Sequence, residues 1–383
     1  MNSISLLPLR FKIHNMVRIA VAGTRGFPGL QGGVENHCEQ LYTRLAREGW
    51  DITVFTRTPY AGRDPQRYKG VSLVPVGCPK NKYLEAIVHV FLCILKARTL
   101  RHDILHLHAI GPSFFAPMAL LLGMKVVVTH HGPDYQRKKW PSFARLFLRL
   151  CERIGMRFAD EVIAITPTIM DEIRRKSGRH AVVIPNGVIV PKPAETDEVL
   201  ERFELQKGRY VLAVGRLVPE KGFHDLIDAY AGGRFGDWKL VIVGSADHED
   251  RYSLDLQEQA NRHPGVILTG FLSGQPLHEI YSHAGLFILP SYHEGLSIVL
   301  LEAMSYGISC LASDIPANRN VELEEDRFFP AGDVQALTTK IRDYLHRPFE
   351  DPQRKAQIER IAGRYDWDTI ARQTGQVYRR LVS

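Results

Sequence analysis

Short apolar runs recur along the chain, separated by longer segments in which apolar residues return every three or four positions. Runs of this length that are rich in Val, Ile and Leu are typical of strands buried in a parallel sheet, and the segments between them are typical of amphipathic helices. The predicted strands are residues 17–22, 51–55, 71–76, 103–108, 125–129, 161–165, 181–184, 210–214, 239–243, 266–268, 286–290 and 308–312. Alternation of strands and helices predicts an α/β fold with doubly wound sheets.

The alternating pattern occurs twice, and a stretch rich in proline and charge, residues 191–197, separates the two occurrences. A chain of 383 residues is also too long for one ordinary core. We therefore predict two domains joined by a linker, with a helical segment at the end and a disordered extension or mis-assigned start before the first strand. The predicted boundaries are 1–16, 17–188, 189–200, 201–362 and 363–383.

Composition is that of a globular protein, with 45% hydrophobic and 24% charged residues. The net charge of +7 favours acidic partners, such as phosphorylated ligands or an anionic membrane surface. No apolar run reaches the roughly 20 residues that cross a bilayer. The cysteines are odd in number and lack C-x-x-C spacing, which favours buried thiols in a reducing cytoplasm. They are Cys38, Cys78, Cys93, Cys151 and Cys310.

One stretch, residues 285–307, carries the most chemistry. A predicted buried strand passes through a polar loop into a predicted helix that begins near Ser297 and ends at Gly307. The N–H groups at the start of such a helix favour an anion. Glu294 and Glu302 bracket the turn, eight positions apart. With a phosphate at the helix start, a ribose at one acid and a hexose at the other, the stretch predicts a nucleotide-sugar site.

A glycine-rich loop follows the first predicted strand and contains Gly32-Gly33 before a helix. Glycines let a backbone approach a phosphate closely. A dinucleotide site is the alternative, but the spacing is G-x-x-G-x-x-G and the second strand ends in Thr56-Arg57, with no acid for a ribose. Glu35 and Asn36 fall in the first helical turn, where they face an acceptor or simply supply favourable charge to the helix.

In the second half, the segment GRLVPEKG places Arg216 and Lys221 just after a predicted strand. Two cations there would neutralise charge on a leaving diphosphate, or they would be ordinary surface residues. Gly244 ends the next strand and would form a wall of the same site. Phe271 lies near the base of a nucleotide or packs in the core.

Histidines gather where two predicted strands end: His106 and His108, and then His130 and His131. These positions lie at the carboxyl edge of the sheet, where ligands bind in doubly wound folds. H-x-H and H-H spacings without a carboxylate are weak metal signatures, so we predict no metal site. His106 alternates with leucines, as a hydrogen-bonded core histidine would.

The residues EGLSIVLLEAM and GRLVPEKG resemble the signatures of retaining glycosyltransferases of group 1, or family 4, and the glycine loop is similar to that of bacterial surface-polysaccharide enzymes. The resemblance implies a GT-B fold, in which two Rossmann-like domains face a cleft. It implies catalytic roles for His131, Arg216, Lys221 and Glu294. The implied donor-binding residues are Gly32, Gly33, Arg216, Lys221, Gly244, Glu294, Gly295, Leu296, Ser297 and Glu302, and the acceptor-binding residues are Glu35, Asn36 and His108.

The implied reaction is transfer of a hexosyl group from a UDP or GDP sugar to a glycan or polyprenyl-linked acceptor, with retention at the anomeric carbon. No D-x-D signature occurs in a suitable loop, so we expect no cofactor and no metal requirement. A nucleotide-sugar 2-epimerase and a non-catalytic nucleotide-sugar-binding protein are the alternatives of the same shape. The resemblance also implies that the last helix packs back on the first domain.

A basic and aromatic segment, residues 137–157, remains outside this scheme. Arginines at 145, 149, 153 and 157 repeat every four residues and therefore line one helix face. Together with nearby Trp and Phe residues, this face predicts contact with an anionic membrane surface, or it is a solvated helix face. Nothing resembles a nucleic-acid-binding module, so we expect no nucleic acid as a partner. The predicted location is the cytoplasm, with possible attachment to the inner face of the plasma membrane.

Overall fold

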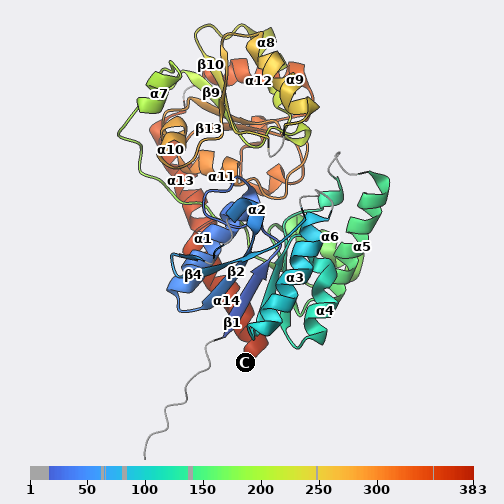
Figure 1. Ribbon diagram of the computed structural model, residues 1–383. Helices are drawn as coiled ribbons and strands as arrows, with labels where there is room; N and C mark the ends of the chain where they lie inside the picture. The colour runs from blue at the N-terminus through green and yellow to red at the C-terminus, as the bar shows by residue number, and fades with distance from the viewer. Residues whose placement is uncertain are drawn as a thin grey trace, which may run out of the picture.

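The structure, a computed structural model, describes residues 17–61, 64, 66–79, 84–136, 141–246, 249–347 and 349–383. The predicted extension at 1–16 and the first part of the basic segment, residues 137–140, lie outside the described residues. The chain forms two α/β domains, with the first half of the sequence in one and most of the second half in the other (Figure 1).

The N-terminal domain is built on a sheet of order β3-β4-β2-β1-β5-β6-β7-β8. Its strands are β1 (Arg18–Ala22), β2 (Asp51–Arg57), β3 (Gln66–Tyr68), β4 (Val71–Val76), β5 (Ile104–His108), β6 (Lys125–His130), β7 (Glu161–Ala164) and β8 (Val182–Val183). Its helices are α1 (Gly33–Arg47), α2 (Thr58–Ala61), α3 (Glu85–Thr99), α4 (Ala116–Leu121), α5 (Ser142–Phe158) and α6 (Pro167–Ser177). The short edge strand β3, which the sequence did not predict, pairs antiparallel with β4; the other pairings are parallel.

The C-terminal domain has a parallel sheet of order β11-β10-β9-β12-β13-β14. Its strands are β9 (Tyr210–Val214), β10 (Lys239–Val243), β11 (Val266–Gly270), β12 (Leu286–Leu289), β13 (Ser309–Ser313) and β14 (Phe328–Phe329). Its helices are α7 (Glu198–Arg202), α8 (Phe223–Gly233), α9 (Arg251–Asn261), α10 (Gly274–Ser282), α11 (Ile298–Ser305), α12 (Val334–Leu345) and α13 (Asp351–Arg364). Helix α7 begins inside the predicted linker at 189–200.

Strand β1 shows how the apolar pattern builds the layers. Its alternate residues point to opposite faces of the sheet, so Ile19 and Val21 pack with α1, whereas Ala20 and Ala22 pack with α3. All four are fully buried. Because both faces are covered by helices, the strand reads as a continuous apolar run, which is why the sequence pattern locates it.

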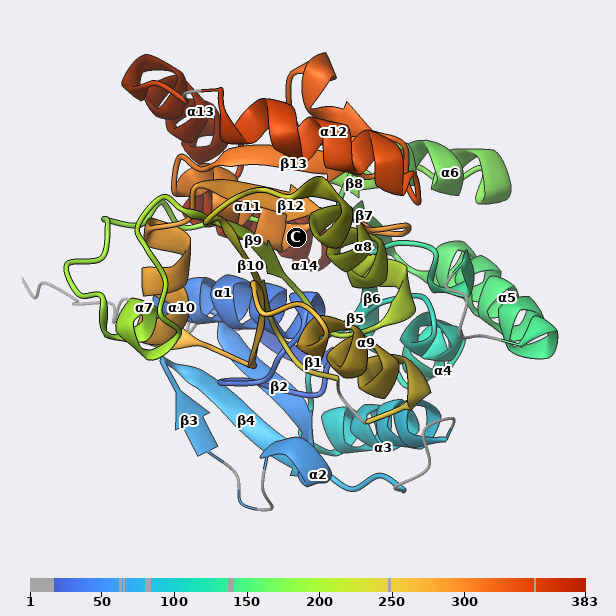
Figure 2. The same ribbon diagram turned by 90° about the horizontal axis from the view of Figure 1, so that it is seen from above.

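Helix α14 (Trp367–Val382) belongs to the end of the chain but packs on the N-terminal domain. Figure 1 shows it running from α13 into the lobe that holds α1 and β1, and in Figure 2, seen from above, it is viewed nearly end-on beside the C mark. Arg44 of α1 binds Asp368 with Nε to Oδ1 at 2.9 Å. The chain crosses beside residue 188, whose backbone N–H donates to the Tyr365 carbonyl at 2.8 Å. The two domains are therefore linked twice.

Candidate active site between the domains

The strand–loop–helix unit predicted at 285–307 is present as β12, a loop and α11. Ser297 occupies the N-cap position with an extended backbone, and its side chain caps nothing. Ser297 is 4% exposed, and its Oγ has no hydrogen-bond partner among the described residues. A buried hydroxyl without a partner beside the N–H groups of a helix start is suited to an anionic ligand such as a phosphate.

Glu294 lies in the loop before α11 and forms an ion pair with Lys221, which follows β9 in the same domain. Lys221 Nζ donates to Glu294 Oε1 at 2.6 Å, and Ser291 Oγ donates to the same oxygen at 2.6 Å. Burial alone would raise the pKa of Glu294, but Lys221, Ser291 and His293 hold it below its usual value. Glu294 is therefore ionised at neutral pH and able to accept hydrogen bonds from a hydroxyl.

The loops after β9 and β10 form the wall beside this pair. Arg216 follows β9 and is half-buried. Gly244 follows β10 with φ of +144°, and a Cβ there would lie 1.8 Å from the Gly215 carbonyl oxygen. Only glycine fits at this position, because a side chain would collide with the neighbouring strand end and the backbone angle disfavours other residues. The wall consequently stays open and presents backbone groups.

The glycine loop before α1 reaches the same wall from the opposite domain. Ser245 Oγ donates to Gln31 Oε1 at 3.0 Å, so the tip of the loop contacts the C-terminal domain. Gly32 has φ of +150° and precedes α1. A Cβ on Gly33 would lie 3.9 Å from Ile298 of α11. The starts of α1 and α11 therefore face each other across the cleft.

Glu35, a predicted acceptor contact, is buried and turned into this loop. Its Oε1 accepts hydrogen bonds from the Arg25 backbone N–H at 3.3 Å and from Arg25 Nε at 3.1 Å. Arg25 in turn donates to the Gln31 carbonyl. In this structure Glu35 holds the shape of the glycine loop, because its carboxylate satisfies an arginine that is itself largely buried.

Asn36 and Glu302 meet across the domain boundary. Asn36 Nδ2 donates to Glu302 Oε1 at 3.3 Å, and Tyr281 Oη donates to Glu302 Oε2 at 3.1 Å. All three line a cavity of about 240 Å³. Burial raises the pKa of Glu302 to about 7, even though both hydrogen bonds favour the ionised form. This carboxyl is therefore poised to change its charge near neutral pH.

His131 follows β6 and lies where the domains touch. Its Nε2 is 2.9 Å from His108 Nδ1, and His108 Nε2 is 2.5 Å from Tyr42 Oη. Burial, together with His130 and His106, lowers the pKa of His131 to about 3. His131 is therefore a neutral imidazole at pH 7. His108, a predicted acceptor contact, is completely buried and contacts His131 rather than the cleft.

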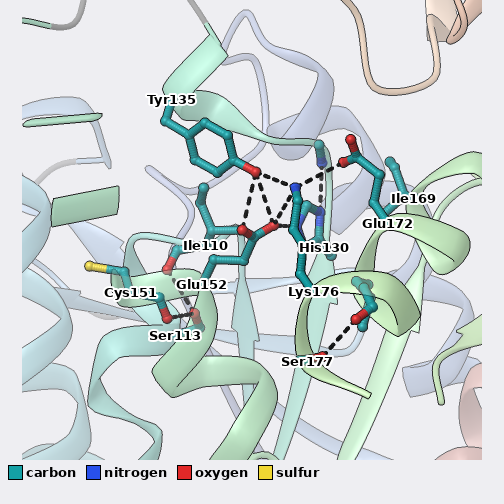
Figure 3. A network of polar contacts seen from close by, with 12 residues as sticks. Ile110, Ser113, His130, Tyr135, Cys151, Glu152, Ile169, Glu172, Lys176 and Ser177 are labelled. Carbon is teal, nitrogen blue, oxygen red and sulfur yellow. Dashed lines mark hydrogen bonds and ion pairs between the residues drawn. The ribbon is translucent and has the colours of Figure 1, made fainter. Parts of the chain in front are cut away.

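His130, the neighbour of His131 in the chain, points toward Glu152 in a buried polar network (Figure 3). Its Nδ1 accepts the Gly132 N–H at 3.1 Å, so its Nε2 carries the hydrogen that is donated to Glu152 Oε1 at 2.9 Å. Tyr135 and Lys176 surround the same carboxylate. Burial alone would raise the pKa of Glu152, but His130 and Lys176 hold it low. This buried network anchors the loop that carries His131.

The two domains are in direct contact at this loop. A Cβ on Gly295 would lie 2.0 Å from the His131 carbonyl oxygen, and Asn186 Nδ2 donates to the Leu296 carbonyl at 3.1 Å. A cavity of about 450 Å³ opens beside Glu294 and Gly295. Its lining comes from both domains, with Pro133 and Thr166 on one side and Ile315 on the other. A ligand there would touch both domains at once.

The structure thus brings Lys221, Glu294 and Ser297 together in one domain and places His131 opposite them. Sequence reasoning missed His37, which lies in α1 beneath His131. The signal was available, because His37, Leu41 and Leu45 share one helix face at a spacing of four. Phe271 is 44% exposed, so the alternative of core packing for this residue is wrong.

Comparison with known proteins agrees with this architecture. The chain matches the family "Glycosyl transferases group 1" over residues 196–363 and "Glycosyltransferase Family 4" over residues 31–190. It is 26% identical to a glycogen synthase of Mycobacterium tuberculosis, with 94% of each chain covered. It is 27% identical to a phosphatidyl-myo-inositol mannosyltransferase of Mycolicibacterium smegmatis, with 91% of this chain and 90% of that one covered.

The fold is also that of a solved structure from Anabaena, HepE in complex with UDP-glucose. The two chains superpose with a TM-score of 0.75 at 19% identity, covering 94% of this chain and 99% of that one. At this level of identity the likeness concerns the fold alone: two facing domains with parallel sheets.

Proposed function

Because the chain is a group 1 glycosyltransferase with the GT-B fold, we propose that it transfers a hexosyl group from a UDP or GDP sugar to a hydroxyl, with retention at the anomeric carbon. The observation that carries the proposal is the 2.6 Å pair of Lys221 and Glu294 together with the Ser297 hydroxyl at the start of α11, which has no hydrogen-bond partner among the described residues. The segment after β9 thus supplies a cation, and the loop between β12 and α11 supplies a carboxylate for sugar hydroxyls and a hydroxyl and N–H groups for a phosphate.

Departure of the nucleotide requires stabilisation of negative charge on its phosphate. Lys221 and Arg216 carry positive charge beside the N–H groups at the start of α11, and such preorganised groups act most strongly where water is excluded. Lys221 is only 15% exposed. We assign leaving-group stabilisation to these two cations. The pairing of Lys221 with Glu294 fixes its ammonium in advance, so little reorganisation is needed when the bond breaks.

The hexose is proposed to lie between Glu294 and His131. Glu294 accepts hydrogen bonds from sugar hydroxyls, and the neutral imidazole of His131 donates one without bringing a positive charge close to the developing oxocarbenium ion. Glu302 and Asn36 both line the cavity of about 240 Å³, and we assign Glu302 to the ribose hydroxyls. The two acids can bind different parts of the donor because they are eight positions apart: Glu294 precedes α11, and Glu302 lies within it.

The acceptor is proposed to be a glycan or a polyprenyl-linked glycan of the cell envelope. The cavity of about 450 Å³ beside Glu294 has room for sugar units of such an acceptor. One relative, the phosphatidyl-myo-inositol mannosyltransferase, is named for a lipid acceptor. We further propose that α5 attaches the enzyme to an anionic membrane surface, where a lipid-linked acceptor would be concentrated.

The described part of α5 supports this attachment. Phe143 is 73% exposed and Leu146 is 68% exposed, and the four arginines of the helix are exposed as well. Phe147 contacts Phe114 with ring centroids 5.7 Å apart, so the apolar surface continues beyond the helix. Apolar rings among cations match the interface of an anionic bilayer. No described helix is long and apolar enough to cross a membrane.

The proposal is tested with purified protein and a panel of UDP, GDP and dTDP sugars, by thermal shift and by release of the nucleoside diphosphate. We expect one donor class to stabilise the protein, and we expect Lys221→Ala to lower turnover by roughly 100-fold. This variant should also melt at a lower temperature, because Glu294 loses the cation that compensates its burial, so turnover is compared well below its melting temperature. Activity should persist in EDTA, since cations of the chain take the place of a metal.

The proposal is wrong if no activated sugar stabilises the protein or is consumed with any glycan acceptor. Conversion of UDP-N-acetylglucosamine to its 2-epimer without an acceptor would identify an isomerase instead. Full turnover by Lys221→Ala would remove the assigned leaving-group role. The matched control is Lys355→Ala, an exposed lysine on α13, which should behave like the unaltered protein.

A further inference from the structure

Three imidazoles converge beside the contact between the two domains, where the His131 backbone lies against Gly295. His37 comes from α1, His108 from the end of β5 and His131 from the loop after β6. One nitrogen of each ring lies within 4.8 Å of those of the other two, the only such group of three or more metal-ligating side chains found among the described residues. The ring centroids are 5.0 to 5.5 Å apart. Three separate elements therefore deliver one ligand atom each to a common point.

His37 shows that the cluster is incomplete without a ligand. Its Nδ1 is 3.0 Å from Asn186 Oδ1, which makes Nδ1 the donor and leaves Nε2 with a free lone pair. His37 is only 3% exposed, and this Nε2 is buried without a hydrogen-bond partner among the described residues. A buried nitrogen without a partner is costly, and a bound cation beside it would satisfy it.

We propose that His37, His108 and His131 form a binding site for a divalent transition-metal ion, with Zn²⁺ as the best fit. Imidazole nitrogens suit zinc, copper and nickel, whereas magnesium prefers oxygen. Zn–N bonds of 2.0–2.1 Å in a tetrahedron put the ligand nitrogens about 3.3 Å apart. The observed 2.9 Å between His108 and His131, with the other separations below 4.8 Å, needs only small side-chain movements.

The groups behind the rings are suited to hold the ligands. The nitrogens that point away from the ion are held by neighbours: Asn186 Oδ1 accepts from His37 Nδ1, and Tyr42 Oη contacts His108 Nε2. Tyr42 Oη is also 2.9 Å from His106 Nδ1, so it can accept from His108 and donate to His106. The hydrogen that now lies between His108 Nδ1 and His131 Nε2 would move, when the ion binds, to the other nitrogen of the ring that carries it. Such outer contacts orient imidazoles around metals.

Three histidines leave the fourth position of a tetrahedral ion without a protein ligand, and of the three rings only that of His131 is not buried. The ion would engage His131, whose role toward the sugar belongs to the proposed function. We therefore expect the metal to inhibit transfer rather than support it, and chelators to relieve the inhibition. This consequence rests on the proposed function, but binding of the metal does not.

Binding is tested first with Co²⁺ as a spectroscopic probe, in the full-length Cys78→Ser protein. Cys78 is the described cysteine that is not buried, so its replacement removes the accessible described thiol. We expect visible d–d absorption with a stoichiometry of one ion per chain, displaced by Zn²⁺. In His37→Gln, which replaces the ligand nitrogen with a weakly coordinating amide, the affinity should fall by about 10-fold or more. Absence of this band, or equal affinity in His37→Gln, overturns the site.

A control replaces a histidine that lies outside the cluster. His346 ends α12 in the C-terminal domain, and His346→Gln should leave the Co²⁺ spectrum and its titration unchanged. Circular dichroism and melting temperature of His37→Gln establish whether it folds; if it does not, Asn186→Ala, which releases the outer nitrogen of His37, serves instead and should also weaken Co²⁺ by about 10-fold.

The activity arm uses Zn²⁺ in buffer free of chelating anions. We expect Zn²⁺ to inhibit the unaltered enzyme and the half-inhibiting concentration to rise by about 10-fold or more in His37→Gln. His37→Gln should retain turnover in EDTA. A Co²⁺ band without inhibition would refute the role of His131 in transfer and leave the metal site standing. Inhibition that is equal in both proteins would refute inhibition through this site, whereas the Co²⁺ titration decides the site itself.

Discussion

At the scale of single residues, charge depends on burial and on the partner that each side chain meets. Glu294 and Glu302 have the same chemistry and lie eight positions apart, yet their pKa values move in opposite directions. Glu294 is held ionised by a lysine, whereas Glu302 is desolvated without a cation among its hydrogen-bond partners in the described structure. The two acids can therefore serve one donor in different charge states.

A first prediction concerns Glu302→Gln. The pKa of Glu302 is about 7 in the folded protein and near 4.5 when unfolded, so the folded state holds the extra proton between these values. Stability from this group is complete below pH 4.5 and is lost as pH rises to 7. The neutral Glu302→Gln escapes this loss. Relative to the unaltered protein, it should gain on the order of 2 kcal/mol between pH 4.5 and 7.5.

Urea unfolding at pH 5 and at pH 7.5 measures this difference. The difference should be smaller than the full pKa shift implies, because Glu302 is only partly buried and borders a cavity. The matched variant Glu258→Gln changes an exposed acid of α9 and should show no such pH dependence. An equal response of both variants to pH would contradict the raised pKa of Glu302.

At the scale of elements, α14 shows how a distant segment supports the first domain. Its Tyr378 contacts Trp50 with ring centroids 5.5 Å apart, and Tyr378 Oη lies 2.6 Å from His106 Nδ1. His106 reaches Thr129 with its other nitrogen at 2.7 Å, as expected for a satisfied core histidine. The helix therefore supports the strands whose ends carry the histidine cluster.

A second prediction concerns the start of α14. Asp366 caps the helix by accepting from the Thr369 N–H at 2.7 Å, and Asp366→Ala should cost about 1 kcal/mol of stability. Asp333 caps α12 in the same way, with the Ala336 N–H at 2.8 Å. Both replacements should cost a similar free energy, but through different domains.

Hydrogen exchange distinguishes the two caps. Because α14 packs on α1, Asp366→Ala should speed amide exchange in α1. Because Thr338 of α12 donates to a carbonyl of α8, Asp333→Ala should speed exchange in α8 instead. If Asp366→Ala loosened only the C-terminal domain, the anchoring of α14 on the first domain would be contradicted.

At the scale of the whole molecule, the two domains meet through backbone as well as side chains. Gly295 leaves no space for a Cβ, since His131 of the other domain lies against it. A side chain at this position would therefore collide with the other domain and keep the two domains further apart. Groups assigned to the donor lie mainly on the C-terminal domain, whereas His131 comes from the other, so separation of the domains should affect catalysis more than donor binding.

A third prediction follows for Gly295→Ala. The new methyl group forces the domains apart but keeps the backbone N–H, so turnover should fall about 10-fold or more while donor affinity changes little. Steady-state kinetics and donor titration measure the two effects. Gly232→Ala, with open space around the Cβ at the end of α8, is the neutral control. A Gly295→Ala enzyme with normal turnover would show that closure at this point is not needed.

A fourth prediction concerns the surface of α5. Flotation with vesicles should show binding to membranes that contain anionic lipid, weakened by salt, and little binding to neutral membranes. The double variant Arg153→Glu/Arg157→Glu should lose most of this binding, by about 1 kcal/mol or more per charge. Arg342→Glu/Lys355→Glu makes the same charge change on exposed residues of the other domain. Equal binding by the two double variants would refute attachment through α5.

Much of the architecture was predictable because it depends on local patterns. Apolar runs located the strands on either side of residue 190, since strands covered on both faces need apolar side chains throughout. The edge strand β3 was not predicted because its three residues, Gln66–Tyr68, do not form an apolar run. Helix α7 escaped because its residues follow a proline-rich segment and form little more than one turn.

The amino-acid sequence by itself determined the two sheets, the loop of Glu294 before α11 and the glycine-rich loop before α1, because neighbouring residues along the chain create these features. Tertiary structure alone decided that His130 turns to Glu152, that Asn36 meets Glu302 across 266 positions, and that His37 joins His108 and His131. These contacts depend on which helix face meets which strand end, and that is set by packing of both domains together.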